Sequence, residues 1–300
     1  MRVFVTGATG FIGSAVVADL IEAGHQVLGL TRSEAGAKAL AEAGAEVHRG
    51  SLEDLESLRR GAAQSDGVIH TAFNNISETS NFADSAQADR RAIETMGEAL
   101  AGSGRPLVVT SGTGLLTPGR LGTERDGPDP ASPAALRIPS EEGTLSFAGR
   151  GVRASVVRLP PTVHGDGDHG FVPALIGIAR AAGVSAYPGD GANRWAAVHR
   201  LDAAHLFRLA LEAAPAGVRL HAIGEEGVPV RDIAEVIGRH LQLPVTAVPR
   251  AEADGHFGWL APFITLDAPA SSTVTREQMG WHPVQPGLIP DLDKGHYFSD

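Results

Sequence analysis

The chain has 300 residues, 43% of them hydrophobic, and a formal net charge of −10 at pH 7 with no block of basic residues. Nucleic-acid binding requires a basic face that neutralises phosphates, so this composition argues against a nucleic-acid partner. Cysteine is absent, which excludes disulfides, thiolate metal sites and a thiol nucleophile.

The sequence also lacks the marks of a membrane or secretory segment. No apolar run reaches the ~18 residues that a bilayer-spanning helix needs. The first predicted strand starts at Arg2, which leaves no room for a signal peptide. We therefore expect a cytoplasmic protein without a membrane partner, built as one large α/β domain with a smaller lobe.

A glycine-rich turn follows the first strand, residues 3–5, and leads into a predicted helix over residues 14–22. The turn consists of Thr6, Gly7, Ala8, Thr9, Gly10, Phe11, Ile12 and Gly13. Gly7 can adopt a positive φ, Gly10 lets a ligand approach the backbone, and Gly13 lets the helix pack tightly on the strand. The first helical N–H groups lack intrahelical partners and lie at the positive end of the helix dipole, so they suit a pyrophosphate.

An ordinary tight turn is the alternative explanation of these glycines. A second strand at residues 26–30, which ends about 20 residues after them, instead favours a dinucleotide-binding βαβ unit. That strand ends in Thr31, Arg32 and Ser33, without the acid that binds the ribose 2′-hydroxyl of NAD. A guanidinium and two hydroxyls suit a 2′-phosphate, so we predict NADP(H), although Arg32 as a merely solvated charge is the alternative.

Strands and helices alternate as far as residue 159, which predicts a Rossmann-type, doubly wound parallel sheet in an α/β fold. The further predicted strands are residues 46–48, 67–70, 106–110 and 152–159, and the helices are residues 34–43, 53–61, 85–101 and 134–149. Ser51 is the expected N-cap of the 53–61 helix. The segment 117–133 has no periodicity and is either a substrate lid or a disordered insertion.

The alternation ends at Pro160 and Pro161. Helices are predicted over residues 172–182, 203–213 and 230–241, and a strand near residues 218–223 is expected to return to the main sheet. We therefore expect a dinucleotide-binding domain over residues 1–165 and a substrate-binding lobe made mostly of residues 166–300.

Six segments together carry a family resemblance. They are residues 6–13 (TGATGFIG), 70–73 (HTAF), 110–113 (TSGT), 158–165 (RLPPTVHG), 195–202 (WAAVHRLD) and 279–283 (MGWHP). With them the chain resembles the extended or atypical short-chain dehydrogenase/reductase family, which includes sugar-nucleotide epimerases, dehydratases and NADPH-dependent reductases.

The resemblance implies positions around the cofactor. Thr71, Ala72 and Phe73 are expected at the ribose and nicotinamide, with Thr110 nearby. Ser51 and Leu52 are expected at the adenine, and Pro161, Thr162 and Val163 at the nicotinamide. The helices at 85–101 and 134–149 resemble the dimer helices of the family, so the chain is expected to be a monomer or a homodimer.

The chain departs from the family in its catalytic residues. The Tyr-x-x-x-Lys pair of the family aligns with Arg137 to Glu141, and neither Tyr187 nor Tyr297 has a lysine four residues further on. The remaining candidates for handling a proton are the hydroxyls of Ser111 and Thr113, and His164, which has a structural role as its alternative.

Three residues are candidate substrate contacts: Asn74, Arg137 and Trp195. The alternative for Arg137 is an i,i+4 ion pair with Glu141. Residues 164–169 (HGDGDH) lack the ligand order of a calcium loop, and no His-Glu-x-x-His occurs, so no metal is predicted.

A site without a strong acid suits a substrate that is already cationic, because hydride addition to an iminium needs no proton at transfer. We therefore expect NADPH-dependent reduction of a C=O or C=N bond of a small molecule. A sugar-nucleotide epimerase or dehydratase, and a non-catalytic NADP(H) sensor of the NmrA-like kind, are the alternatives.

Overall fold

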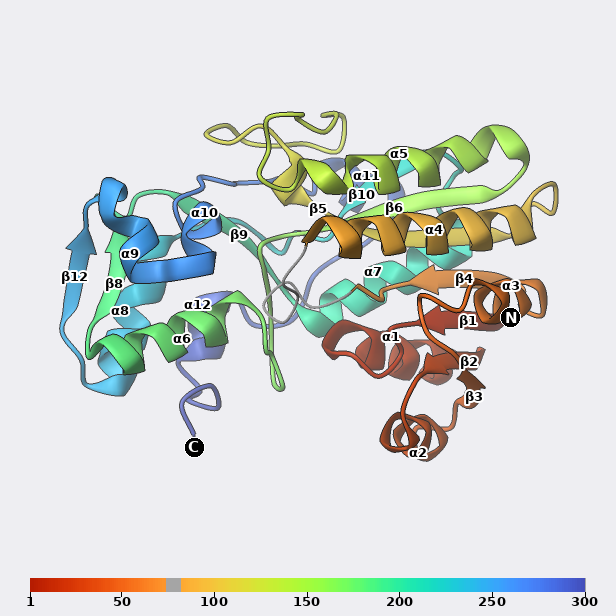
Figure 1. The fold of residues 1–300 in the computed structure, drawn as a ribbon, viewed down its shortest axis with the longest axis horizontal. Helices are drawn as coiled ribbons and strands as arrows, with labels where there is room; N and C mark the ends of the chain where they lie inside the picture. The colour runs from red at the N-terminus through yellow and green to blue at the C-terminus, as the bar shows by residue number, and fades with distance from the viewer. Residues whose placement is uncertain (74–81, 300) are drawn as a thin grey trace.

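A seven-stranded parallel sheet forms the centre of the computed structural model, which describes residues 1–73 and 82–299 (Figure 1). Its strand order is β10-β6-β5-β4-β1-β2-β3. The strands are β1 (Arg2–Thr6), β2 (Gln26–Thr31), β3 (Glu46–Arg49), β4 (Gly67–His70), β5 (Pro106–Gly112), β6 (Arg153–Leu159) and β10 (Val218–His221). This sheet confirms the predicted fold class, and β10 pairs with β6 as expected of the returning strand.

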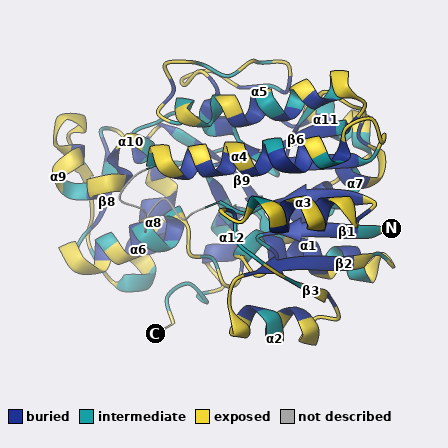
Figure 2. Cartoon of the chain, turned by 45° about the vertical axis from the view of Figure 1, so that its right-hand side comes forward, coloured by how far each residue is buried: buried dark blue, intermediate teal, exposed yellow. Residues whose placement is uncertain are grey.

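Helices cover both faces of the sheet. They are α1 (Phe11–Glu22), α2 (Glu34–Glu42), α3 (Leu55–Ala63), α4 (Phe82–Leu100), α5 (Ile138–Ser146) and α7 (Arg200–Ala213). Successive side chains of β1 point to opposite faces: Val3 and Val5 pack with α1 and α7, whereas Phe4 packs with α3 and α4. The strands β1 and β2 are accordingly buried in Figure 2.

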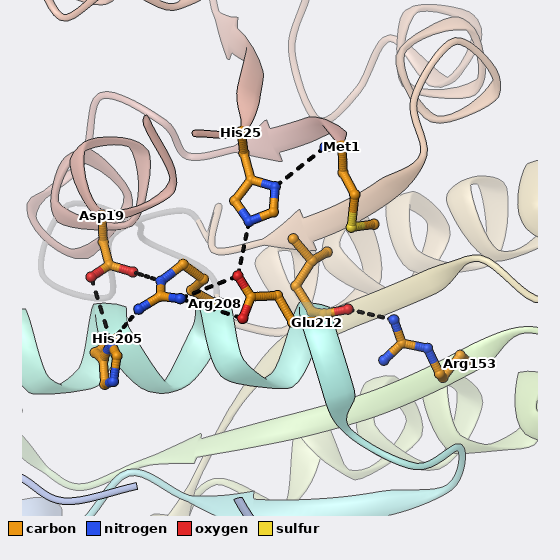
Figure 3. Close-up of polar contacts among 8 residues, drawn as sticks. Met1, Asp19, His25, Arg153, His205, Arg208 and Glu212 are labelled. Carbon is orange, nitrogen blue, oxygen red and sulfur yellow. Dashed lines mark hydrogen bonds and ion pairs between the residues drawn. The ribbon is translucent and has the colours of Figure 1, made fainter. Parts of the chain in front are cut away.

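Polar contacts fix α7 against α1 and the neighbouring strand (Figure 3). Arg208 of α7 donates to Asp19 of α1 at 2.6 Å, and Glu212 pairs with His25 at 2.9 Å. Arg153 of β6 donates to the carbonyl of Ala214 at 3.1 Å. The C-terminal end of α7 is therefore tied to both α1 and the sheet.

The C-terminal part of the chain lies beyond the carboxyl ends of the strands (Figure 1). It contains the small sheet β11-β9-β7 and the pair β12-β8. These strands are β7 (Thr162–His164), β8 (Ser185–Pro188), β9 (Arg194–His199), β11 (Glu225–Pro229) and β12 (Val245–Val248). The helices are α6 (Phe171–Ala182), α8 (Val230–Leu241), α9 (Ala253–Phe257), α10 (Ala261–Ile264), α11 (Thr273–Met279) and α12 (Leu288–Leu292).

The structure decides two local predictions, the N-cap at Ser51 and the nature of the segment 117–133. The N-cap of α3 is Asp54 rather than Ser51, because the Asp54 carboxylate accepts from the Ser57 amide at 3.0 Å. The segment 117–133 is held by backbone bonds such as Gly122 N–H to the Pro269 carbonyl at 2.9 Å, and Glu124 is buried against Thr275. That segment is therefore packed on the C-terminal part of the chain. No helix of the described part is both long and apolar enough to cross a membrane.

Candidate active site

A cleft of about 490 Å³ opens at the carboxyl ends of β1, β2 and β4. Its lining residues are Gly7, Thr9, Gly10, Phe11, Ile12, Gly13, Leu30, Thr31, Arg32, Gly50, Ser51, Leu52, Glu53, Thr71, Ala72, Phe73, Pro161, Thr162, Val163, Asp168, His169, Gly170, Phe171 and Val172. Every residue expected at the cofactor lies there except Ser33 and Thr110. Ser33 accepts from the Gly36 amide as the N-cap of α2, and the Thr110 hydroxyl donates to the His70 carbonyl.

The glycine turn forms one end of the cleft, and two of its glycines have no space for a side chain. Gly7 has φ +68°, and a Cβ on it would lie 2.7 Å from the Ala72 nitrogen. A Cβ on Gly13 would lie 1.9 Å from the Gly7 carbonyl oxygen. The helix α1 can therefore start directly against the turn only with glycine at both positions.

The amino end of α1 presents unused donors to the cleft. The amide of Ser14 bonds to the Gly10 carbonyl, but those of Phe11, Ile12 and Gly13 have no acceptor among the described residues. All three residues line the cleft. Free N–H groups at a helix N-terminus fit a pyrophosphate, so the residues present suit a dinucleotide.

Arg32 directly follows β2 and lies at the other end of the βαβ unit formed by β1, α1 and β2. It is exposed, lines the cleft and has no hydrogen-bond or ion-pair partner within residues 1–73 and 82–299. The nearest following acid, Glu34, pairs with Arg49 at 2.6 Å. Thr31 is buried, and its hydroxyl oxygen accepts from the Ser33 amide at 3.4 Å. Arg32 is thus the cleft residue suited to a phosphate at this end.

The loop of residues 168–170, just before α6, lines the cleft from the C-terminal side. The sequence analysis did not predict this loop at the cofactor site. Asp168 accepts from the Gly170 amide at 2.7 Å and from the Tyr297 hydroxyl at 3.0 Å. Burial raises the pKa of Asp168 to about 6. The His169 ring lies edge-on to Phe11, with 5.9 Å between centroids. In the sequence this stretch suggested only metal ligands, because nothing local indicates that it folds back over the glycine turn.

The three proposed proton-handling residues lie behind the cleft and already have partners. The Ser111 hydroxyl donates to Glu141 at 2.7 Å, and that of Thr113 donates weakly to the Leu159 carbonyl at 3.4 Å. His164 is buried, with Nδ1 2.9 Å from Asp291. Burial lowers the pKa of His164 although Asp291 opposes that change, so the imidazole is neutral near pH 7.

Glu141, at the position that aligns with the family lysine, is fully buried with Arg158. Arg158 Nε donates to it at 3.0 Å and Arg219 donates at 2.7 Å. Burial alone would raise the pKa of Glu141, but the two guanidiniums and Ser111 hold it below its ordinary value. Position 141, which the sequence analysis aligned with the lysine of the family, therefore holds an ionised carboxylate.

Arg137 does not form the i,i+4 pair with Glu141 that was the alternative for it. It ends a short 3-10 helix (Ala135–Arg137) and contacts Asp89 of α4 at 3.3 Å. The expectation for Trp195 is corrected: it is fully buried, and its Nε1 donates to the Phe263 carbonyl at 3.1 Å, so it belongs to the core of the C-terminal part. Asn74 lies outside the described residues.

The comparisons with known proteins agree with this architecture. An uncharacterized protein of Schizosaccharomyces pombe is 52% identical over 300 residues, covering 99% of this chain and 100% of the relative. A 2-alkyl-3-oxoalkanoate reductase of Stenotrophomonas maltophilia is 28% identical over 246 residues, covering 78% of this chain and 73% of the relative. The structure of dTDP-glucose 4,6-dehydratase from Streptomyces venezuelae with NAD bound has a TM-score of 0.79 at 21% identity and covers 98% of this chain and 96% of that chain.

Residues 3–223 match the model of the family described as the NAD dependent epimerase/dehydratase family. This match spans the glycine turn, all seven strands of the main sheet and the residues behind the cleft, and it confirms the family expected from the motifs. The chain therefore belongs to the NAD dependent epimerase/dehydratase family.

Proposed function

We propose that this protein is an NADPH-dependent reductase that acts on a C=O or C=N bond of a small organic molecule. The observation that carries the proposal is the cleft itself: at one end are amides of α1 that have no acceptor among the described residues, and at the other is Arg32, which has no partner within residues 1–73 and 82–299. The relative from Stenotrophomonas maltophilia, named as a reductase of a 3-oxoalkanoate, supports this reaction class.

Different residues of the cleft would bind different parts of the nucleotide. The amides of Phe11, Ile12 and Gly13 would hold the pyrophosphate, and Arg32 would hold the 2′-phosphate. Pro161 and Val163 would border the nicotinamide, which supplies a hydride when the cofactor is bound. The contribution of the protein is to place the electrophilic carbon within reach of that hydride and to exclude water.

None of the three proton-handling residues predicted from the sequence is free to donate a proton to a substrate. Ser111 and Thr113 direct their protons to Glu141 and to a backbone carbonyl, and His164 is buried and neutral. For a carbonyl substrate the hydride forms a C–H bond, the π electrons move to oxygen, and water would protonate that oxygen. An iminium substrate accepts the hydride and becomes an amine with no proton transfer at that moment.

Two other functions fit the residues of this chain less well than the reductase does. By the resemblance, epimerases and dehydratases need the tyrosine of Tyr-x-x-x-Lys to remove a proton from a sugar hydroxyl. Position 137, which aligns with that tyrosine, holds an arginine in this chain. A non-catalytic NADP(H) sensor would bind the nucleotide but reduce nothing. The cleft extends from the glycine turn to α6 and the C-terminal part, which favours a second, smaller ligand beside the nucleotide.

Binding and turnover test the proposal separately. Titration with NADPH, NADP⁺ and NADH should show tighter binding of the two nucleotides that carry a 2′-phosphate. A second assay then measures NADPH oxidation with a panel of aldehydes, ketones and cyclic imines. Equal affinity for NADH and NADPH would contradict the assignment of Arg32. Tight NADPH binding without oxidation by any compound of the panel would favour the sensor.

A further inference from the structure

We propose that Arg137 binds a carboxylate of the substrate, so that this protein reduces oxo acids in preference to neutral or cationic molecules. The inference rests on the proposed reductase function and narrows its substrate class. It comes from the way in which the guanidinium of Arg137 is fixed, and from the donors that remain unused on it.

Three contacts fix the guanidinium at the carboxyl edge of the sheet. Its Nη2 donates to the Thr110 carbonyl of β5 at 3.0 Å and to Oδ2 of Asp89 at 3.3 Å. Its central carbon lies 4.2 Å from the ring centroid of Phe73. Phe73 lines the cleft, so Arg137 lies directly behind a wall of the cleft, next to Thr110 of β5.

The rest of the guanidinium is unengaged. Both hydrogen bonds start from Nη2, whereas Nε is buried and has no hydrogen-bond partner among the described residues. Nη1 makes no hydrogen bond to the described residues. A buried donor without a partner is unfavourable, and the side chain is 16% exposed, so it is still within reach of a ligand. An anion that accepts from these N–H groups would remove the deficit.

The buried carboxylate of Asp89 holds the guanidinium of Arg137 in place. Asp89 is fully buried and lies between Arg137 and His70, and the other ring nitrogen of His70 is 2.6 Å from the Thr6 hydroxyl. Burial by itself would raise the pKa of Asp89, but Arg137 and His70 hold it below its ordinary value. The carboxylate is therefore charged and anchors the guanidinium from the protein side. Arg137 does not itself line the cleft, but its guanidinium lies against the ring of Phe73, which does.

This arrangement separates the two substrate classes left open above. The unused N–H donors of the guanidinium suit a carboxylate, whereas a cationic iminium offers them no acceptor. The reaction is then a carbonyl reduction: the hydride adds to the carbonyl carbon, the electron pair moves to oxygen, and water protonates it. Arg137 acts in binding and takes no part in the transfer of the proton.

A matched pair of aldehydes tests the inference: 4-formylbenzoate and its methyl ester, with NADPH. For the wild-type protein we expect a lower KM for the acid. R137Q should raise the KM for the acid ~10–100-fold, the loss expected for a charge-assisted hydrogen bond, and leave the KM for the ester within about 2-fold. R137K should restore part of the affinity because it keeps the charge.

The control variant is R150Q, which removes an exposed arginine whose partner is Glu98. It should leave both KM values unchanged. NADPH affinity and the melting temperature of each variant show whether R137Q has merely lost structure. Equal effects of R137Q on acid and ester, or no preference of the wild type for the acid, would overturn the inference.

Calorimetric binding of 4-formylbenzoate to the NADP⁺ complex separates this inference from the proposed function. Binding that R137Q abolishes, without turnover of either compound, would support the carboxylate site and contradict the reductase. Turnover of the ester alone would support the reductase and contradict the carboxylate site. Absence of any 4-formylbenzoate binding to the wild-type complex would likewise reject the site.

Discussion

The hydroxyl of Tyr297, near the end of the chain, donates a hydrogen bond to Oδ2 of Asp168 at 3.0 Å. Asp168 lines the cofactor cleft, so this bond joins the C-terminal segment to the loop that covers the glycine turn. Tyr297 also accepts from the Gly165 amide at 2.9 Å. One of the two tyrosines of the chain therefore has a role in shaping the cleft.

The raised pKa of Asp168 predicts a pH dependence of stability. Its pKa is about 6 in the folded protein, against an ordinary value of 3.8, because burial disfavours the charged form. Between these values the folded state binds more protons than the unfolded state, so this group makes stability fall as pH rises from about 4 to about 6.

D168N should remove that fall. Relative to wild type it should raise the free energy of unfolding at pH 7.5 by at most about 3 kcal/mol, with little gain at pH 4, because Asn can still accept from the Gly170 amide. Chemical unfolding at both pH values measures this. The same gain at pH 4 and pH 7.5 would show that the ionisation of Asp168 is not responsible.

Arg32 is expected to decide between phosphorylated and unphosphorylated nucleotides. R32A should weaken NADPH binding by ~10–100-fold, the loss of about 1.5–3 kcal/mol typical of a hydrogen bond to a charged group, and leave NADH binding unchanged. Fluorescence titration measures both affinities. R60A, an exposed arginine of α3 outside the cleft, is the control. A parallel loss of NADH affinity in R32A would reject a contact with the 2′-phosphate.

Gly13 is expected to tolerate no side chain. Its Cβ would lie 1.9 Å from the Gly7 carbonyl oxygen, which is backbone and cannot move aside without displacing the turn. G13A should destabilise the fold by about 3 kcal/mol or more. G143A in α5 meets nothing within 4 Å and should be neutral or stabilise by up to ~1 kcal/mol. Urea unfolding compares the two. Similar stability of both variants would contradict the close contact of the turn.

Glu141 is expected to be needed for stability rather than for proton transfer. E141Q leaves the buried Arg158 without its counter-charge and should cost about 3–5 kcal/mol of unfolding free energy. E142Q, at the next and exposed position, should change stability by less than about 0.5 kcal/mol. Thermal and urea unfolding test this. A stable E141Q variant would mean that Arg158 and Arg219 find other partners.

Most strands of the main sheet could be predicted from the sequence because the patterns that indicate them are local. The apolar runs of β1, β2, β4, β5 and β6, the spacing of the glycines and the missing acid after β2 all lie within short windows. The strands β8, β9, β11 and β12 were missed because they are short and depend on pairing with one another. Asp168 and His169 were missed at the cleft for a related reason, since α6 brings them there.

The sequence by itself determined the family, the parallel sheet, the glycine turn and the absence of a tyrosine–lysine pair, because each depends on residue identity at a fixed local spacing. Only the tertiary structure decided that Glu141 pairs with Arg158 and that Arg137 pairs with Asp89 beside Phe73. Those partners lie 17 to 64 residues apart in the chain. Charge pairing in a buried site is chosen by the packing of β5, β6, α4 and α5, and no local pattern encodes it.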